Sequence, residues 1–239
     1  MLNNSAHRFV DDKYNRGMEE HIVKIISTGS LTHDVKIFRV EKPAGYTFTP
    51  GQATDVSVNT PELKSKKRPF TFTGLDHDPY LEFIIKIYPS HKGVTNEIDK
   101  LAPGDELIIR KAWGAISYKG PGIFIAGGAG ITPFVSIFRD LKTKNQLHGN
   151  RLIFANKTKA DIIMEDELRE LLGTDFINIL SEENHPGYAH GMISEEFLRA
   201  IADDFKSNFY LCGPPPMMNA LKKLLATLGV EKNSITVEF

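Results

Sequence analysis

The 239 residues of this chain fit one large domain or two small ones. Hydrophobic residues make up 41% and charged residues 25%, and the formal net charge of −1 gives no global basic field for nucleic acid or an anionic membrane. The single cysteine, Cys212, excludes an internal disulfide and a cysteine-held iron–sulfur cluster within the chain. Apolar runs are only strand-sized and the first residues lack the apolar segment of a signal peptide, so we expect no membrane span and a cytoplasmic protein.

The first half of the chain has the pattern of an antiparallel barrel. Residues 1–18 are polar, and we expect them to form a tail. From residue 19 to 118, short β-like runs are separated by turn residues, a pattern typical of a Greek-key β-barrel domain. The expected strands are His21–Ser27, Val35–Val40, Ala53–Val58, Phe70–Thr73, Leu81–Tyr88 and Leu107–Arg110, with a short helix at Thr95–Leu101.

The second half, residues 119 to 239, changes to an alternation of strands and helices. Such an alternation predicts a doubly wound α/β domain with a parallel sheet, so the chain as a whole is expected to have two domains. The expected strands are Ile123–Ala126, Leu152–Ala155, Phe176–Leu180, Phe209–Leu211 and Ile235–Phe239; the expected helices are Phe134–Lys142, Met164–Leu172, Ser194–Ala202 and Pro216–Leu228.

The segment from Gly122 to Pro133 carries the clearest functional signal. A buried strand runs into Gly127-Gly128-Ala129-Gly130, after which Thr132 can cap a helix and Pro133 can occupy its first turn. Glycines let the backbone approach an anion and the helix dipole favours negative charge, so this arrangement suits a phosphate. The segment departs from the common G-x-G-x-x-G pattern because Pro133 replaces the last glycine. The alternative is an ordinary tight turn.

Three shorter segments carry weaker signals of the same kind. Cys212 ends an expected strand at the sheet edge where ligands bind, although a buried small apolar residue is its common alternative. Arg68-Pro69-Phe70-Thr71 joins a phosphate-binding arginine to an aromatic side chain, or is an ordinary sheet surface. Gly93-Val94-Thr95-Asn96 begins an expected helix and suits a pyrophosphate, or is a plain helix cap.

Taken together, the four segments resemble the motifs of the ferredoxin–NADP reductase superfamily, over roughly residues 20 to 239. In that family an R-x-[YF]-[ST] motif binds flavin, a G-x-x-[ST] helix start binds the flavin phosphates, a G-G-x-G-[IV]-[TA]-P turn binds NAD(P)H, and a C-G-P-P motif lies under the nicotinamide. The matching segments are Arg68–Thr71, Gly93–Thr95 with Asn96, Gly127–Pro133 and Cys212–Pro215.

The resemblance implies FAD, with FMN as the less favoured flavin, and NAD(P)H as co-substrate. Arg68 would neutralise a flavin phosphate, Phe70 would pack along the flavin, and Thr71 would hydrogen-bond its reactive nitrogen N5. Pro69 would be a further cofactor-binding residue of this motif. The resemblance further implies cofactor contacts from Ile85, Lys86 and Ile87, and phosphate contacts from Gly93, Val94 and Thr95.

On the dinucleotide side, the resemblance places the pyrophosphate at the glycine turn and the nicotinamide near the single cysteine. The residues involved would be Gly128, Ala129, Gly130, Thr132 and Pro133 for the pyrophosphate, and Cys212, Gly213 and Pro214 for the nicotinamide. Family members often end in a strand with a glutamate and then an aromatic residue that covers the flavin. Glu238 and Phe239 match that pattern as catalytic and cofactor-binding residues, or are simply the end of the last strand.

The residues after the second strand of the α/β half bear on coenzyme choice. The acidic residue that would accept the ribose hydroxyls of NADH is missing there. Asn156, Lys157 and Lys159 stand in its place, which favours NADPH. The alternative is that these lysines are only solvated loop residues. The scattered histidines give no pattern for a metal site.

We therefore expect an FAD-dependent NAD(P)H oxidoreductase that takes hydride from NAD(P)H and passes single electrons to a separate flavodoxin or ferredoxin-type carrier. One alternative is an NAD(P)H:free flavin reductase, in which flavin is a loosely held substrate. Another is a flavin-binding electron-transfer subunit of a larger complex without its own turnover. A regulatory nucleotide-binding module is disfavoured because both binding halves are complete. No nucleic-acid partner is expected, and the oligomeric state is left open.

Overall fold

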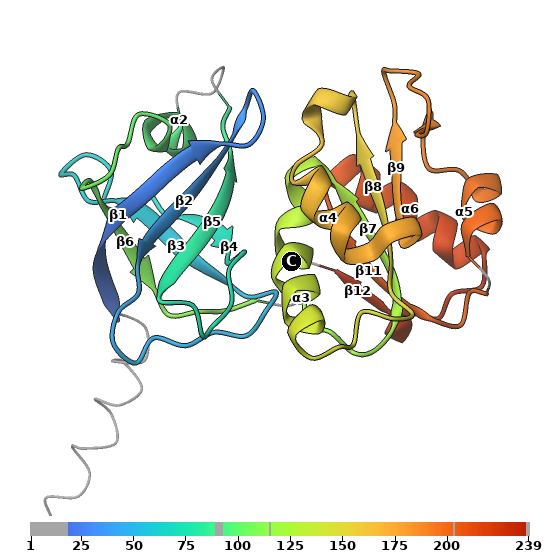
Figure 1. The fold of residues 1–239 in the computed structure, drawn as a ribbon, viewed down its shortest axis with the longest axis horizontal. Helices are drawn as coiled ribbons and strands as arrows, with labels where there is room; N and C mark the ends of the chain where they lie inside the picture. Colours follow the sequence, from blue (N-terminus) through green and yellow to red (C-terminus); the bar gives the residue numbers. More distant parts are fainter. Residues whose placement is uncertain (1–18, 89–92, 115, 203, 238–239) are drawn as a thin grey trace, which may run out of the picture.

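The computed structural model describes residues 19–88, 93–114, 116–202 and 204–237. Two halves lie side by side, one built on an antiparallel sheet and the other on a parallel sheet with helices (Figure 1). The predicted two-domain fold class is confirmed. The expected tail, residues 1–18, lies outside the described residues, and the expected division near residue 118 stays a prediction.

The first sheet is a nearly closed antiparallel barrel with strand order β4-β3-β6-β1-β2-β5. An isolated bridge between Phe72 and Phe83 joins the two edge strands just beyond the end of β4 and so brings the barrel close to closure. The strands are β1 (Glu20–Ser30), β2 (Val35–Glu41), β3 (Ala53–Val58), β4 (Arg68–Thr71), β5 (Tyr80–Lys86) and β6 (Glu106–Arg110), with helix α2 (Val94–Ile98) between β5 and β6.

Strand β5 shows how the barrel is placed against the other half. Because successive side chains of a strand point to opposite faces, Leu81, Phe83 and Ile85 enter the barrel core. Glu82 and Ile84 lie on the opposite face of the strand, and Ile84 packs into the apolar cluster of the second half. One strand therefore supplies both the barrel core and the contact between the two halves.

The second sheet has the order β10-β9-β8-β7-β11-β12, with every adjacent pair parallel. The chain moves outward from β7 in one direction through β8 and β9, then crosses to β11 and β12 on the other side. The switch point lies between β7 and β11, and ligands of such sheets bind at the carboxyl ends of the strands there. The strands are β7 (Gly122–Gly127), β8 (Arg151–Asn156), β9 (Phe176–Leu180), β10 (Ala189–His190), β11 (Asn208–Cys212) and β12 (Ile235–Val237).

Helices cover both faces of the parallel sheet. Side chains of α3 (Thr132–Thr143) and α4 (Glu165–Leu172) pack into one apolar cluster, and those of α5 (Glu195–Ile201) and α6 (Pro215–Thr227) pack into another. Helix α3 lies on the side that faces the barrel (Figure 1). The 3₁₀ turns are η2 (Gly128–Ile131), η3 (Lys159–Asp161), η4 (Gly173–Asp175) and η5 (Lys232–Ser234).

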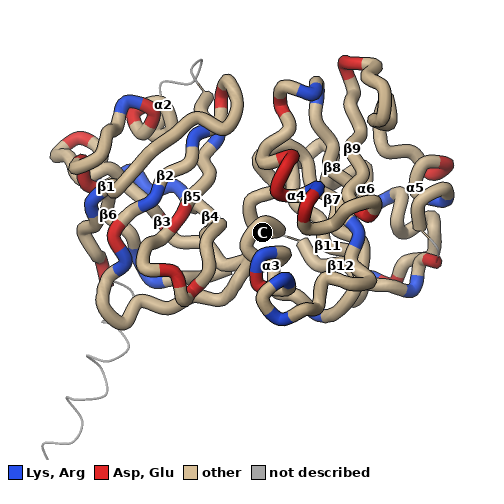
Figure 2. Tube along the Cα trace, in the orientation of Figure 1, with Lys and Arg blue, Asp and Glu red and all other residues tan. Residues whose placement is uncertain are grey.

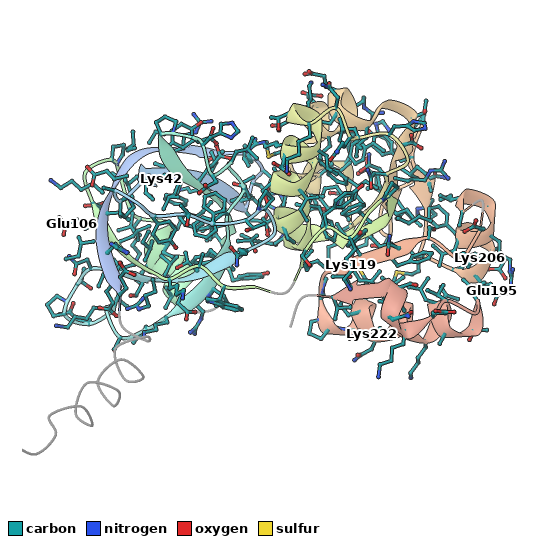
Figure 3. All side chains as sticks on the ribbon, turned by 90° about the horizontal axis from the view of Figure 1, so that it is seen from below. Lys42, Glu106, Lys119, Glu195, Lys206 and Lys222 are labelled. Atoms are coloured by element: carbon teal, nitrogen blue, oxygen red, sulfur yellow. The ribbon has the colours of Figure 1, made fainter. Side chains whose placement is uncertain are left out.

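The connection between the halves is tied to the parallel sheet. The phenol oxygen of Tyr210 in β11 accepts a hydrogen bond from the Lys119 amide at 2.8 Å and donates one to the Gly120 carbonyl at 2.7 Å. Lys119 lies between the two halves in Figure 3. The ring of Tyr210 also stacks on Phe124, with ring centroids 4.2 Å apart. The chain is thus anchored at the point where it enters β7.

The strand boundaries differ from the expected ones at several strands: β1 runs to Ser30 instead of Ser27, β5 ends at Lys86 instead of Tyr88, and β4 is shifted. Its expected range, Phe70–Thr73, was two residues too late, because Arg68 and Pro69 pair with β3 while Phe72 makes only the isolated bridge. The expected cap at Thr132 was also wrong. The turn η2 precedes α3, so Thr132 has helical angles and its hydroxyl donates to the Ala129 carbonyl. Pro133 lies in the first turn of α3, as expected.

Charges of both signs are spread over the two halves (Figure 2). Acidic residues of α4 lie beside basic residues of α3, as in the ion pair of Lys142 with Glu170 at 3.0 Å. Among the described residues, no helix combines the length and apolar character needed to cross a membrane.

Candidate active site

A cleft of about 910 Å³ opens between the barrel and the carboxyl edge of the parallel sheet. Ligand sites are typically on the order of 300–1,000 Å³, so the cleft has room for a large cofactor. It brings together residues from all four segments that the sequence singled out. The predicted site residues that line it are Pro69, Phe70, Thr71, Ile85, Lys86, Thr95, Gly128, Ala129, Gly130, Thr132, Asn156, Lys157, Cys212, Gly213 and Pro214.

The barrel supplies one wall of the cleft. Thr71 ends β4, lines the cleft and is only 6% exposed. Phe70, its neighbour, is half-buried and also lines the cleft. Lys86 ends β5, where its ammonium pairs with Asp34 at 2.7 Å. This wall therefore offers the aromatic ring of Phe70, the hydroxyl-bearing Thr71 and the ammonium of Lys86, which is paired with Asp34.

The glycine turn forms the opposite wall. Gly128 has φ +51°, in the left-handed region, and a Cβ at this position would meet no atom within 4 Å. The backbone there faces open space, as a phosphate cradle requires. At Gly130, a Cβ would lie 2.5 Å from the carbonyl carbon of Cys212 and 2.7 Å from the Gly213 amide nitrogen. The absence of a side chain at Gly130 is what lets the turn pack directly on the end of β11.

Cys212 lies where the sequence analysis expected it. It ends β11, is 4% exposed, and lines the cleft next to the glycine turn. Its thiol is not part of a disulfide. The packing of Gly130 against the Cys212 carbonyl shows that the two motifs form one surface.

Asn156, at the end of β8, gives an independent indication of a polar ligand. It is 8% exposed, and neither its amide oxygen nor its amide nitrogen has a hydrogen-bond partner within the protein. Buried side-chain amides nearly always form hydrogen bonds, so we expect a polar group of a ligand in the cleft to bond to the Asn156 amide. Its neighbour Lys157 is paired with Glu182 at 2.9 Å, and the hydrogen bond and charge of Glu182 raise the pKa of Lys157.

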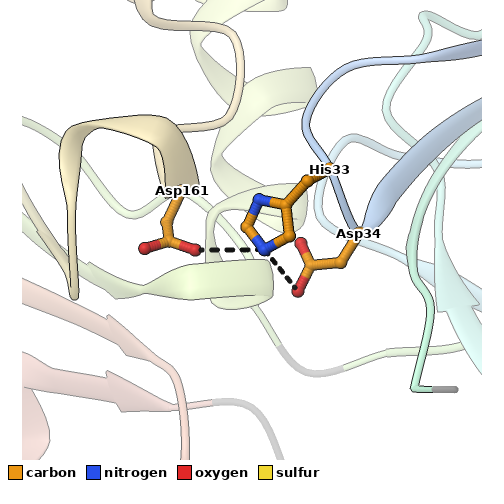
Figure 4. A group of neighbouring side chains, drawn as sticks. All are labelled: His33, Asp34 and Asp161. Atoms are coloured by element: carbon orange, nitrogen blue, oxygen red, sulfur yellow. Dashed lines mark ion pairs between the residues drawn. The ribbon is translucent and has the colours of Figure 1, made fainter.

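A cluster of His33, Asp34 and Asp161 joins the two halves at the side of the cleft (Figure 4). The His33 Nε2 atom lies 3.7 Å from an Asp34 oxygen and 3.8 Å from an Asp161 oxygen. The carboxylates have other partners, because Lys86 pairs with Asp34 and Thr158 donates to Asp161. Burial raises the pKa of Asp161, but these hydrogen bonds outweigh it and lower the pKa. We assign this cluster to contact between the halves.

Some predicted site residues lie away from the cleft wall. Arg68 is exposed at the start of β4, where its guanidinium donates to the Lys67 carbonyl. Ile87 and Val94 are buried in the barrel core, while Gly93 precedes α2 and Pro133 is buried in α3. Glu238 and Phe239 lie outside the described residues. The cofactor roles of all these residues stay predictions.

Sequence reasoning missed several residues that line the cleft. Trp113 is 41% exposed and is the single tryptophan of the chain. Met192 is 75% exposed on the opposite side, where Ser181 also lines the cavity. The single tryptophan, just after β6, was the clue to this wall in the sequence, because large aromatic residues are common at binding surfaces. Met192 belongs to a loop without any motif.

The cleft thus fits a flat ring on the barrel side and a phosphate-bearing dinucleotide on the side of the parallel sheet. The open backbone at Gly128 and the unbonded Asn156 amide suit a dinucleotide. The aromatic side chain of Phe70 and the buried Thr71 suit a flat ring. These features define a two-domain flavin- and dinucleotide-binding protein.

Comparison with known families finds two matching family models. Residues 22–118 match the family model of the oxidoreductase FAD-binding domain, and residues 124–223 match that of the oxidoreductase NAD-binding domain.

Two relatives illustrate the similarity. The propane 2-monooxygenase reductase component of Rhodococcus jostii (strain RHA1) is 30% identical over 222 residues, which cover 86% of this chain and 59% of that protein. The chain therefore spans less than two thirds of that relative's length. NADH-cytochrome b5 reductase 2-A of Vanderwaltozyma polyspora is 31% identical over 239 residues, which cover 92% of this chain and 78% of the relative.

Solved structures share the fold. The CS-b5R domains of human Ncb5or, in an NAD+ form, give a TM-score of 0.82 with 25% identity, over 94% of this chain and 71% of that one. A ferredoxin NADP+ reductase from Neisseria gonorrhoeae with bound FAD and NADP gives 0.81 with 18% identity, over 92% and 98%. The chain belongs to the ferredoxin–NADP reductase superfamily, the FAD- and NAD(P)-binding oxidoreductases. The predicted family and cofactor pair are confirmed.

Proposed function

We propose that the protein is an NAD(P)H-dependent reductase that loads FAD with a hydride equivalent and passes single electrons to a separate carrier protein, most simply of the flavodoxin or ferredoxin type. The observation that carries this proposal is the single cleft that joins Thr71 and Phe70 of the barrel to Gly128, Gly130 and Cys212 of the parallel sheet. A flavin-side wall and a dinucleotide-side wall that face each other across one cavity suit direct transfer between two bound rings.

The protein's part in this reaction is binding, orientation and exclusion of water. FAD, when bound, supplies the hydride acceptance and the one-electron release, which no side chain of the cleft supplies. The glycine turn holds the dinucleotide phosphates, the Asn156 amide bonds to the same ligand, and Cys212 fills the space beside the reacting ring. On the barrel side, the buried Thr71 offers its hydroxyl to the flavin, and Phe70 packs along the flavin ring. Lys86, Thr95 and Lys157 supply polar contacts around them.

A protein acceptor is supported by the relatives. One is named as the reductase component of a monooxygenase and another as a reductase of cytochrome b5, so both names point to a protein partner. A free flavin reductase is the second candidate, favoured by the exposed apolar side chains of Trp113 and Met192 that line the cleft.

Acceptor choice separates these two functions. We expect the FAD-loaded protein to reduce an added flavodoxin, ferredoxin or cytochrome b5 repeatedly while retaining its own FAD through gel filtration. A protein that elutes without flavin, and whose NAD(P)H consumption rises in proportion to added free FMN or riboflavin, would be a free flavin reductase.

The Cys212 thiol is expected to support hydride transfer without acting as a nucleophile. Cys212→Ser keeps the size of the side chain, so it should retain FAD while slowing anaerobic flavin reduction on the order of tenfold through altered ring placement. Stopped-flow reduction at saturating dinucleotide measures this rate. An unchanged rate would make Cys212 an ordinary buried small residue, and a covalent adduct during turnover would contradict the non-nucleophilic role.

Coenzyme preference is expected to depend on Lys157 and Lys159. These lysines follow Asn156, whose side-chain amide has no hydrogen-bond partner in the protein. We expect the parent protein to prefer NADPH, and Lys157→Ala/Lys159→Ala to lower the NADPH/NADH ratio of kcat/KM by up to about fivefold, because exposed charge contacts are worth at most about 1 kcal/mol. The Glu182 partner of Lys157 keeps the effect small. Lys144→Ala, an exposed lysine outside the cleft, is the control. A parent that prefers NADH, or an unchanged ratio in the double variant, would contradict the assignment.

A further inference from the structure

Arg139 of α3 reaches across the boundary between the two halves. One of its guanidinium nitrogens, Nη1, donates to Glu82 Oε1 at 2.7 Å and to the Thr73 carbonyl oxygen at 2.8 Å. Glu82 lies in β5 of the barrel with a side chain only 2% exposed, and the Arg139 side chain is 19% exposed. A buried ion pair therefore joins two residues 57 positions apart, one from each half.

The surroundings of the pair hold both groups in their charged forms. Arg139 also donates to the two carboxylate oxygens of Glu167 at 2.6 and 2.9 Å, and Glu82 accepts from Arg39 at 3.0 Å and from the Thr73 hydroxyl at 3.1 Å. Burial raises the pKa of Glu82, but the Arg139 charge and these hydrogen bonds outweigh it and lower the pKa. Removal of Arg139 leaves Glu82 paired with Arg39 alone, and removal of Glu82 leaves Arg139 paired with Glu167 alone, so either change weakens the compensation of a buried charge and destabilises the contact between the halves.

Both residues of this ion pair lie close along the chain to residues that line the cleft. Thr132, which lines the cleft, precedes Arg139 by seven residues, about two helical turns on the same face of α3. On the barrel side, Thr73 follows Thr71 by two residues along the chain. Ile84, also a cleft residue, follows Glu82 by two residues in β5. The ion pair thus connects the dinucleotide wall to the flavin wall through short, regular elements.

The contact around Arg139 has a second hydrogen bond between the halves. The Gly51 amide, in the loop before β3, donates to the buried Ser136 hydroxyl at 3.1 Å. Ser136 precedes Arg139 by one turn of α3. The apolar cluster that contains Phe138 and Leu141 of α3 includes Val35 and Ile84 of the barrel. One face of α3 therefore packs against the barrel through an ion pair, a hydrogen bond and apolar contacts.

We propose that Arg139, acting through Glu82 and Thr73, is a positioning residue that fixes the glycine turn against the flavin-facing strand. This inference rests on the proposed transfer of hydride between a dinucleotide and FAD in the cleft. Transfer between two bound rings depends steeply on their separation, and a misplacement of about 1 Å can cost on the order of 100-fold in rate. The Glu167 contact lies within the second half and serves to orient Arg139.

Variants of the two arms of the network test the proposal. We expect Arg139→Gln and Glu82→Gln to slow flavin reduction at saturating dinucleotide on the order of 10- to 100-fold, with bound FAD retained and dinucleotide Kd changed much less. Arg139→Lys keeps the charge without the forked geometry and should fall between parent and Arg139→Gln. Lys142→Gln is the matched control, because Lys142 also joins α3 to α4 through Glu170 but does not reach the barrel.

Amide hydrogen exchange gives a readout that needs no cofactor. The Gly51 amide should exchange faster in Arg139→Gln and Glu82→Gln than in the parent, while amides in the barrel strand β2 stay protected. Lys142→Gln should leave both unchanged. Should Arg139→Gln fail to fold, Arg139→Lys and Glu82→Gln carry the same comparison.

A purely structural role would give lower thermal stability with the parent's rate of flavin reduction, and this result would overturn the proposal. Unchanged exchange at Gly51 in Arg139→Gln or Glu82→Gln would overturn it as well. If the parent itself is not reduced by NADPH or NADH, the proposed function fails, and the exchange experiment still decides whether Arg139 fixes the two halves.

Discussion

Gly130→Ala is expected to slow dinucleotide-driven reduction of the flavin strongly. The new Cβ would lie 2.5 Å from the carbonyl carbon of Cys212 and 2.7 Å from the amide nitrogen of Gly213, both backbone atoms of the facing motif. The backbone must move, which should lower the free energy of unfolding by about 3 kcal/mol and slow flavin reduction on the order of 100-fold or more, because the phosphate cradle is displaced. Urea unfolding and stopped-flow reduction measure the two effects.

Gly128→Ala is the matched control for this prediction. No atom lies within 4 Å of its Cβ position, but φ is +51°, so the substitution should cost about 1–2 kcal/mol of stability through backbone strain. Its methyl group would enter the open space of the cleft and weaken dinucleotide binding with less damage to the fold. A Gly130→Ala protein with the stability and reduction rate of the parent would contradict the tight junction of the two motifs.

Loss of the Arg68 guanidinium is expected to weaken FAD binding by about one to two orders of magnitude. Hydrogen bonds to a charged group are worth about 1.5–3 kcal/mol, which corresponds to that range of affinity. In the structure, Arg68 begins β4, three residues before the cleft residue Thr71, and its exposed guanidinium donates to the Lys67 carbonyl. We expect it to turn toward the flavin phosphates when FAD binds.

Quenching of Trp113, the single tryptophan and a cleft residue, reports FAD binding to Arg68→Ala directly. Lys67→Ala removes the same charge from the neighbouring exposed position and should change affinity by less than about threefold, because surface charges are screened. Equal FAD affinity in Arg68→Ala and the parent would remove Arg68 from the cofactor site. Recovery of FMN from the denatured protein would correct the cofactor and leave the fold unchanged.

The sequence predicted the architecture from local patterns, and about half of the residues that line the cleft from those patterns and the family resemblance. Alternating strands and helices indicate parallel strands whose carboxyl ends meet at one edge, and the structure packs Gly130 against Cys212 at that edge. The start of β4 was missed because Pro69 weakens a strand signal. Proline is tolerated there because β4 is an edge strand of the sheet.

Contacts between the halves could not be predicted from the sequence. Glu82 and Arg139 each look like ordinary charged residues in a strand and a helix, and only the tertiary fold brings them to 2.7 Å. The sequence did point to Asn156, but the side-chain amide that has no hydrogen-bond partner at the edge of the cleft could be found only in the structure. The cap expected at Thr132 failed because the 3₁₀ turn η2 moves the start of the helix, a detail of backbone geometry.

Anaerobic titration of the FAD-loaded protein with NADPH and with NADH tests the central claim most directly. If the cleft joins a flavin wall to a dinucleotide wall, one of the two dinucleotides bleaches the yellow flavin absorbance completely with about one equivalent, since hydride carries two electrons to one FAD. The same titration with Gly130→Ala should show far slower bleaching. A parent protein that holds FAD but stays yellow with both dinucleotides would contradict the account.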